Sequence, residues 1–478
     1  MNNISAKSES VLVLGVISSV VLSCSSGTSG RDSSDRKPNL VFVFADQWRA
    51  EATGYSGNSQ VITPNADRLA KESVNFTTAI ATCPVSSPYR GSLLTGQYPL
   101  THGIFFNDKP LAGEAVTIAE VFRDNGYSTA YIGKWHLNGH PRGEERDKHR
   151  LMPVPAERRQ GFEYWKVLEC SHDYNNSIYY DENDVKQKWQ RYDAEAQTDS
   201  AIAYINRKKD QSFMLFLSWG PPHDPYQTAP ERFRNIYSGW RDIELRPNVP
   251  DSLAEKASKQ IAGYYAHIAA LDECLGKLLG AINEAGIEDN TIFVFTSDHG
   301  DMLQSHGQSN KQKPWDESIR VPFLLRFPQK IRKSREVAIP FGTIDIMPTL
   351  LGLSSLPIPD SVEGTDFSSY LLGNGNIDIK AGLIMCPVPF HQWSFANGGR
   401  EYRGVRSERY TYARDLRGPW LLFDNKQDPY QLNNLINNPG YSEIQKELDE
   451  ELNLLLKKTG DEFREADYYM QKWNYDYD

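Results

Sequence analysis

The sequence predicts an α/β protein with a large, mostly parallel sheet flanked by helices, and a smaller C-terminal α+β domain. Two observations predict the main sheet. Short, uninterrupted apolar runs are typical of strands buried on both faces, and stretches with helical periodicity lie between them. The pattern changes after residue 373, which predicts the second domain. A chain of 478 residues is long enough to bury such a core.

The N-terminal segment is predicted to direct export. The apolar run over residues 11–22 is too short to span a bilayer and is typical of a signal peptide. Because Val21-Leu22-Ser23-Cys24 resembles a bacterial lipobox, we expect a signal peptide over residues 1–23, lipidation of Cys24 and a flexible tether over residues 24–37. The protein is then held in the bacterial envelope, periplasmic or cell-surface, by its lipid anchor alone. A secretory signal with an incidental cysteine is the alternative.

Charge and cysteine usage exclude two classes of function. The net charge is -10, from 62 acidic and 52 basic residues, and no long basic run offers a surface for nucleic acid. Four cysteines follow the tether without any Cys-x-x-Cys pair, so a zinc cluster is not indicated. They are Cys83, Cys170, Cys274 and Cys386. We expect free thiols, with two disulfides as the alternative.

Four apolar runs are predicted as strands, and each is followed by polar residues. Residues 39–45 lead to Asp46 and Gln47, residues 128–132 to Lys134 and His136, residues 213–219 to His223, and residues 291–296 to Asp298 and His299. Helices are predicted over residues 63–74, 115–125 and 252–285. Ligands of α/β folds bind outside the carboxyl ends of strands, so these polar side chains are expected to converge. Any one of them alone is more typical of a turn or a surface group.

Residues 83–96 are the most informative segment. Pro88 fits the first turn of a helix, with Ser86 beside the N-terminus of that helix. Backbone N–H groups and the positive end of the helix dipole then favour an anion such as sulfate near Ser86. Arg90, one turn later, adds a planar fork of donors. A capped helix without any ligand is the alternative that these residues leave open.

The segment Ser86-Ser87-Pro88-Tyr89-Arg90, followed by Leu93-Leu94-Thr95-Gly96, resembles the signature of the sulfatase family in its serine form. The resemblance covers almost all of the chain after the tether and implies an alkaline phosphatase-like fold. It also implies that Ser86 is oxidised to formylglycine; Cys83 does not fit the spacing. Tyr89 stands where many members have serine.

A site for one divalent metal is a second implication of this resemblance. Asp46 and Gln47 match the first metal-binding segment of the family, and Asp298 and His299 match the second. Ser86 is expected to complete the site. Gln47 replaces an acid and His299 replaces an amide, which makes the site less anionic, and Ca²⁺ is the expected metal.

The resemblance implies a set of residues around the sulfate. Lys134 and His136 lie in a Gly-Lys-Trp-His segment whose Lys and His contact the sulfate and the formylglycine in the family. His223 is expected to be the general acid, and Lys311 resembles the sulfate-binding lysine, with Lys313 as its rival. The expected catalytic set is therefore Ser86, Arg90, Lys134, His136, His223 and Lys311.

Hydrolysis of a sulfate monoester needs a nucleophile, cations on the sulfate oxygens and an acid for the leaving alcohol. The hydrated aldehyde of the family carries two hydroxyls on one carbon. One hydroxyl attacks sulfur, and deprotonation of the other expels sulfate. A serine precursor implies a serine-oxidising maturation enzyme. The predicted function is sulfate ester hydrolysis, on a sulfated carbohydrate or glycan.

The domain boundaries and the sugar-binding residues are predicted from weaker patterns. The catalytic domain is expected over residues 38–373 and the C-terminal subdomain over residues 374–478, with strands at 402–413 and 420–423 and an acidic amphipathic helix at 442–458. His172, Asp173, His391 and Trp393 are candidates for sugar binding.

Two other functions compete with sulfate ester hydrolysis. Asp46-Gln47-Trp48-Arg49 also resembles a segment of phosphodiesterases and phosphonate monoester hydrolases of the same fold. A non-catalytic glycan-binding lipoprotein is the alternative from a different class, and the presence of Ser86, Arg90, Asp46 and Asp298 argues against it.

Overall fold

The computed structural model describes residues 1, 36–140 and 146–476. The chain divides into two units, residues 1–36 and 37–478, and the second contains every described helix and strand. The predicted signal peptide, Cys24 and most of the predicted tether lie outside the described residues. Within the described ranges, no helix combines the length and the apolar character needed to cross a bilayer.

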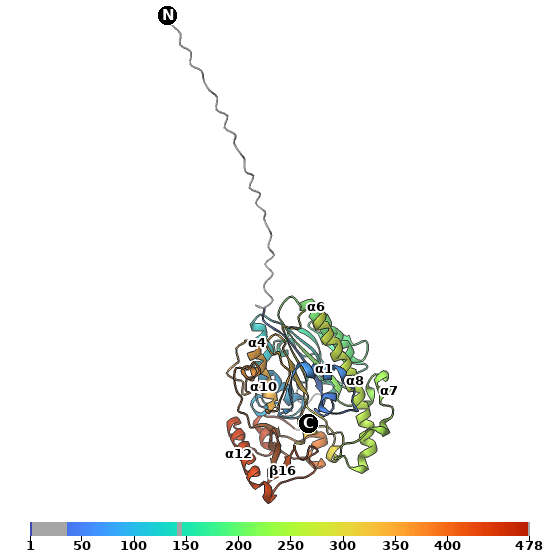
Figure 1. Ribbon diagram of the computed structural model, residues 1–478, viewed down its shortest axis with the longest axis vertical. Helices are drawn as coiled ribbons and strands as arrows, with labels where there is room; N and C mark the ends of the chain where they lie inside the picture. Colours follow the sequence, from blue (N-terminus) through green and yellow to red (C-terminus); the bar gives the residue numbers. More distant parts are fainter. Residues whose placement is uncertain (2–35, 141–145, 477–478) are drawn as a thin grey trace. The chain divides into compact units, whose positions relative to one another are not determined.

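A ten-stranded sheet forms the centre of the second unit (Figure 1). In spatial order its strands are β11 (Arg335–Val337), β2 (Val74–Phe76), β10 (Phe323–Arg326), β9 (Thr291–Ser297), β1 (Asn39–Asp46), β8 (Phe213–Pro222), β4 (Ser128–Lys134), β5 (Tyr164–Leu168), β6 (Ile178–Asp181) and β7 (Lys186–Lys188). The five central strands from β9 to β5 run parallel, whereas β10, β6 and β7 pair antiparallel to their neighbours. This arrangement confirms the predicted fold class.

Side chains of the central strand β1 alternate between two hydrophobic cores. Leu40 and Phe42 face one core, and Val41 and Val43 face the other. The first core is covered by α2 (Ser86–Thr95), α4 (Ile118–Asp124) and α10 (Thr343–Leu353), and the second by α1 (Pro64–Glu72), α6 (Asp193–Lys208) and α8 (Ala254–Glu284). Figure 1 shows α4 and α10 on one side of the sheet, with α6 and α8 on the other. Burial on both faces explains why these strands are continuous apolar runs.

The C-terminal part of the unit is a four-stranded antiparallel sheet covered by one long helix. Its strands are β13 (Ala381–Cys386), β14 (Tyr402–Ser407), β15 (Tyr410–Asp415) and β16 (Gly418–Asp424), and the helix is α12 (Ser442–Thr459). The prediction of a single strand over residues 402–413 is wrong, because the chain turns between β14 and β15. Ser407 Oγ accepts a hydrogen bond from the Tyr410 backbone N–H at 2.8 Å and closes this turn. The predicted strand at 420–423 and the predicted helix at 442–458 lie within β16 and α12.

Shorter elements complete the fold. They are β3 (Ala79–Ile80), which pairs with β12 (Phe341–Gly342), and the helices α3 (Pro99–His102), α5 (Arg146–Arg150), α7 (Glu231–Ile236), α9 (Asp316–Ile319), α11 (Ser368–Leu371) and α13 (Ala466–Lys472). The four cysteines of the described residues are buried and free, as expected: Cys83, Cys170, Cys274 and Cys386.

Candidate active site

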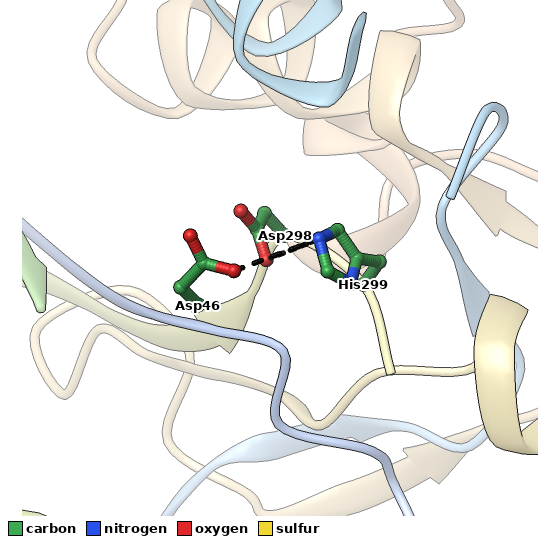
Figure 2. Close-up of side chains that lie close together, drawn as sticks. All are labelled: Asp46, Asp298 and His299. Carbon is green, nitrogen blue, oxygen red and sulfur yellow. Dashed lines mark ion pairs between the residues drawn. The ribbon is translucent and has the colours of Figure 1, made fainter. Parts of the chain in front are cut away.

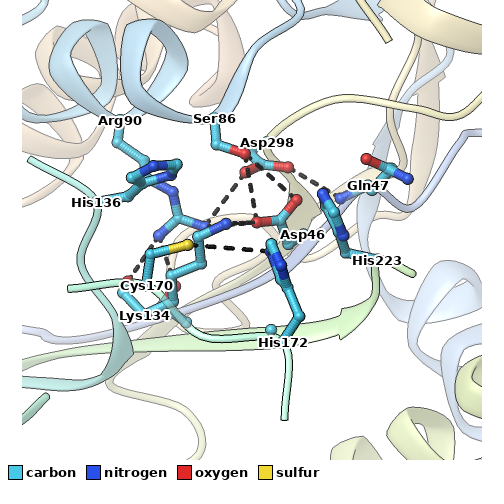
Figure 3. Close-up of polar contacts among 12 residues, drawn as sticks. Asp46, Gln47, Ser86, Arg90, Lys134, His136, Cys170, His172, His223 and Asp298 are labelled. Carbon is cyan, nitrogen blue, oxygen red and sulfur yellow. Dashed lines mark hydrogen bonds and ion pairs between the residues drawn. The ribbon is translucent and has the colours of Figure 1, made fainter. Parts of the chain in front are cut away.

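Polar side chains from distant parts of the chain meet at the carboxyl ends of the parallel strands (Figure 3). Asp46 is the last residue of β1, Asp298 follows β9, and Lys134 is the last residue of β4. Ser86 is the first residue of α2, whose N-terminus lies against these strand ends. Asp46, Asp298 and Ser86 are completely buried. The predicted convergence of these residues is therefore observed.

A glycine allows β4 to bring Lys134 into this cluster. Gly133 has a positive φ of 108°, which side chains other than hydrogen rarely tolerate. A Cβ atom at this position would lie 2.0 Å from the backbone oxygen of Ser218 in the neighbouring strand β8. The close approach of the two backbones therefore requires glycine immediately before Lys134.

Two carboxylates and one imidazole form the centre of the cluster (Figure 2). One ligand atom each from Asp46, Asp298 and His299 lies within 4.8 Å of the others, and all three residues are buried. Ser86 Oγ lies 3.1 Å from His299 Nε2 and 3.3 Å from the nearer Asp46 oxygen. Burial alone would raise the pKa of Asp46, but the nearby cations, Lys134 first among them, hold that pKa well below its usual range. The cluster thus combines carboxylate oxygens with a ring nitrogen, a donor set that suits a divalent cation.

The hydrogen bonding of His299 determines which ring nitrogen faces Ser86. His299 Nδ1 lies 3.0 Å from the backbone oxygen of Gly300, which can only accept, so Nδ1 carries the proton. Burial lowers the pKa of His299 to about 4. The imidazole is therefore neutral near pH 7, and its Nε2 lone pair points toward Ser86.

Gln47 lies beside the cluster and links it to two further residues. Its backbone N–H donates to Asp298 Oδ1 at 3.0 Å, and its side-chain Nε2 donates to Asp301 Oδ2 at 2.7 Å. Its Oε1 accepts a hydrogen bond from Lys311 Nζ at 3.0 Å. Asp301 is fully buried, and the sequence patterns did not single it out. It orients the amide of Gln47 so that the carbonyl oxygen faces Lys311.

Arg90 lies close to both carboxylates of the cluster. Its Nη2 donates to Asp298 Oδ2 at 3.2 Å and lies 3.6 Å from Asp46 Oδ2. Its Nη1 donates to the Lys134 backbone oxygen at 2.7 Å and to Ser218 Oγ at 2.8 Å. The guanidinium is 1% exposed and therefore fixes the two carboxylates and the end of β4 relative to α2.

Two lysines and a histidine lie next to Asp46, and the lysines carry the positive charge. The Lys134 ammonium is paired with the Asp46 carboxylate, and Lys311 Nζ lies 2.8 Å from His223 Nε2. His223 Nδ1 lies 2.9 Å from the backbone oxygen of Asp224, so Nδ1 donates and Nε2 accepts from Lys311. Burial and the Lys311 ammonium lower the pKa of His223 well below its usual range. The imidazole is therefore neutral near pH 7, and Lys311 carries the proton of this pair.

His136 is oriented by a carboxylate that sequence patterns did not identify. His136 Nε2 lies 3.0 Å from Asp108 Oδ1, and Arg150 binds both oxygens of Asp108 at 2.7 Å. Nε2 therefore donates to Asp108, and buried Nδ1 has no hydrogen-bond partner among the described residues. Asp108 and Arg150 follow no strand and belong to no recognised motif, so nothing in the local sequence identified them.

Comparison with known proteins assigns the chain to a family. The family model described as "Sulfatase" matches residues 38–356. The chain belongs to the sulfatase family. A second family model, described as the C-terminal part of N-sulphoglucosamine sulphohydrolase, matches residues 304–469 of this sulfatase.

Individual sulfatases are similar over most of their length. The chain is 44% identical to an ulvan-active sulfatase of Formosa agariphila, over 96% of this chain and 89% of the relative. It is 30% identical to an endo-4-O-sulfatase of Bacteroides thetaiotaomicron, over 89% of this chain and 92% of the relative. The solved structure of yidJ from Bacteroides fragilis is 33% identical and superposes with a TM-score of 0.80, covering 91% of this chain and 98% of that structure. These similarities confirm the predicted enzyme class and fold.

The two candidate lysines of this chain, Lys311 and Lys313, make different contacts in the structure. Lys311 Nζ contacts Gln47 and His223, within the polar cluster. Lys313 Nζ instead donates to the Ser309 backbone oxygen at 2.6 Å and lies 5.1 Å from the ring centre of Trp393. Burial lowers the pKa of Lys313 to about 7. The geometry therefore favours Lys311 as the lysine that meets the sulfate.

Replacing each lysine by methionine tests this assignment. Lys311→Met is expected to lower kcat/KM for sulfate release about 10²-fold or more, because one charged donor to the anion is lost. Lys313→Met keeps the length of a side chain that packs on Trp393, and it is expected to change kcat/KM by less than about threefold. Steady-state kinetics of both matured variants measure the difference. The opposite ranking would identify Lys313 as the sulfate-binding lysine.

The four residues predicted to bind sugar are placed differently from one another. His172 lies in the cluster, stacked on His223 (Figure 3). Asp173 and His391 are exposed. Trp393 is 3% exposed and belongs to a hydrophobic core of the C-terminal sheet, so its ring offers no open face for a sugar. Aromatic rings often stack on sugars, but the same apolar surface also favours burial, as it does for Trp393.

Proposed function

We propose that this sulfatase hydrolyses sulfate esters of a sulfated polysaccharide, with the side chain of Ser86 as the precursor of its nucleophile. One observation carries the proposal: Ser86 Oγ, at the N-terminus of α2, lies within 3.4 Å of His299 and of Asp46, the carboxylate that pairs with Lys134. The names of two similar proteins, an ulvan-active sulfatase and an endo-4-O-sulfatase, support a polysaccharide substrate.

The mature nucleophile that we propose is formylglycine. Oxidation of Ser86 removes two hydrogen atoms from its CH₂OH group and gives an aldehyde, in a reaction that needs a serine-oxidising maturation enzyme and its electron acceptor. When hydrated, this aldehyde supplies two hydroxyls on one carbon, one to attack sulfur and one to allow the release of sulfate. An unmodified serine would retain the sulfate as a stable ester.

One divalent metal is proposed to bind at Asp46, Gln47, Asp298, His299 and Ser86. The residues fit such an ion, because the carboxylates of Asp46 and Asp298 and the unprotonated Nε2 of His299 lie within 4.8 Å of one another in a buried site. We propose Ca²⁺, since oxygen atoms dominate this donor set. A bound cation supplies positive charge to a sulfate oxygen and favours an ionised nucleophile.

The remaining cluster residues bind the anion and move protons. Lys134 and Lys311 direct their ammonium groups to the space around Asp46 and Gln47, where they can pair with sulfate oxygens. His223 accepts a hydrogen bond from Lys311, so this pair holds a proton that can pass through His223 Nε2 to the leaving alcohol. His136, oriented by Asp108, has Nδ1 available to accept a proton.

Cellular location and domain limits are also proposals. The lipobox-like segment at Cys24 supports export and lipid anchoring in the bacterial envelope. The change of pattern after residue 373 supports a boundary between a catalytic domain over 38–373 and a C-terminal subdomain over 374–478.

Mass spectrometry and a sulfate assay test the proposed function together. Co-expression with a serine-oxidising maturation enzyme should lower the mass of the peptide containing Ser86 by two hydrogen atoms, and the protein should then release sulfate from ulvan oligosaccharides. Protein made without that enzyme should be inactive. Full turnover by unmodified protein would contradict the role of formylglycine. Faster hydrolysis of a phosphate or phosphonate ester than of the matching sulfate would favour the alternative activity.

A further inference from the structure

The loop after β5 contacts His223 at two points. Tyr174 Oη donates to the His223 backbone oxygen at 2.9 Å, and the Tyr174 side chain is 1% exposed. The imidazole of His172 lies flat on that of His223, with 4.3 Å between ring centres and 5° between ring planes (Figure 3). Two side chains of one loop therefore contact both the backbone and the ring of His223.

These contacts complete the fixation of the His223 ring. The hydrogen bonds of Nδ1 to Asp224 and of Nε2 to Lys311 lie at the ring edge. These two bonds do not prevent the His223 ring from tilting. His172 covers one face of the ring and restrains this motion. Cys170 Sγ lies 3.9 Å from His172 Nε2 and restrains the His172 ring in turn.

The stack is compatible with a charged His223. Burial, together with Lys134, lowers the pKa of His172 to about 3, so its ring is neutral near pH 7. A neutral aromatic ring that stacks on an imidazolium does not repel it, whereas two imidazolium rings at this distance would repel each other.

We propose that His172 is a positioning residue that fixes the ring plane of His223, so that Nε2 is aimed at the oxygen of the leaving alcohol. The proposal rests on the proposed function, in which His223 delivers the proton. Proton transfer depends steeply on the alignment of donor and acceptor. This role differs from the sugar contact that sequence patterns suggested for His172.

The dependence of rate on the leaving group tests the role of His172. Substituted phenyl sulfates from 4-nitrophenyl to phenyl share one shape, but the poorer leaving groups depend more on an acid. His172→Ala is expected to lower kcat about 10-fold or more for phenyl sulfate and less than about threefold for 4-nitrophenyl sulfate. His172→Phe retains a stacking ring and should restore the wild-type dependence. An equal loss on all esters, or a change in KM alone, would overturn the proposal.

Two matched variants and the wild type complete the experiment. His223→Ala should steepen the leaving-group dependence more than His172→Ala does. His306→Ala removes a histidine stacked on Trp315 rather than on a residue of the cluster, with 5.1 Å between ring centres, and should leave the dependence unchanged. If matured wild-type protein releases no sulfate from any ester, the proposed function fails. If the wild type is active and His172→Ala shows the same leaving-group dependence as the wild type, only the positioning role fails.

Discussion

Replacing Ser86 by alanine is expected to abolish sulfate release while the protein stays folded. The change deletes one oxygen atom, which lies 3.1 Å from His299 Nε2 and 3.3 Å from Asp46, and with it the only precursor of the proposed nucleophile. Loss of a nucleophile costs about 10⁴-fold or more in kcat, whereas loss of one hydroxyl costs about 1 kcal/mol of stability. Sulfate release measured by ion chromatography, together with thermal unfolding of the same sample, gives both quantities.

Two variants of the same helix serve as controls for Ser86→Ala. Ser92→Ala removes a buried hydroxyl of α2 that contacts His102 instead of the cluster, and it should retain activity. Ser86→Cys places the other residue of the family signature at this position. Co-expression with a cysteine-oxidising maturation enzyme should restore turnover. Wild-type activity of Ser86→Ala would exclude Ser86 as the nucleophile precursor.

The central strands could be predicted from the sequence because both of their faces are buried. Strands β1, β8 and β9 contain the apolar runs Leu40–Ala45, Phe213–Leu217 and Ile292–Phe295, since helices cover the sheet on each side. The edge strands gave no such signal. The three residues of β7 are Lys-Gln-Lys and all are exposed, so their strand conformation comes from pairing with β6 rather than from an apolar pattern.

In the candidate site, residues next to predicted strands could be predicted, whereas residues placed by long-range contacts could not. Asp46 and Asp298 were predicted because each follows a buried strand, and parallel strands place their ends together. Asp108 contacts His136 and is bound by Arg150, the last residue of α5, and no local pattern reveals these long-range contacts. The stacking of His172 on His223 could not be predicted, because the two residues follow different strands and no local pattern pairs them.

Replacing Asp298 by asparagine is expected to remove both metal and activity. The substitution keeps the size of the side chain but replaces one of the two carboxylates of the cluster of Asp46, Asp298 and His299 by an amide. Loss of a charged ligand should lower metal occupancy at least about 10-fold and kcat about 10³-fold or more. Elemental analysis of the purified protein gives a measurement of occupancy that does not depend on turnover. Full occupancy in Asp298→Asn would exclude this residue as a ligand.

Stability should respond more weakly than metal binding to the Asp298→Asn change. Asp298 Oδ2 accepts a hydrogen bond from Arg90, and Asp46 is the remaining carboxylate near that buried guanidinium. Weakening one buried, charged hydrogen bond costs about 1–3 kcal/mol, which chemical denaturation can resolve. Asp272→Asn is the matched control, because Asp272 is a buried carboxylate of α8 that accepts hydrogen bonds from Asn65 and Ala66, outside the cluster. Asp272→Asn should lower the free energy of unfolding by a similar amount. It should leave metal occupancy unchanged, because Asp272 supports the fold without belonging to the cluster.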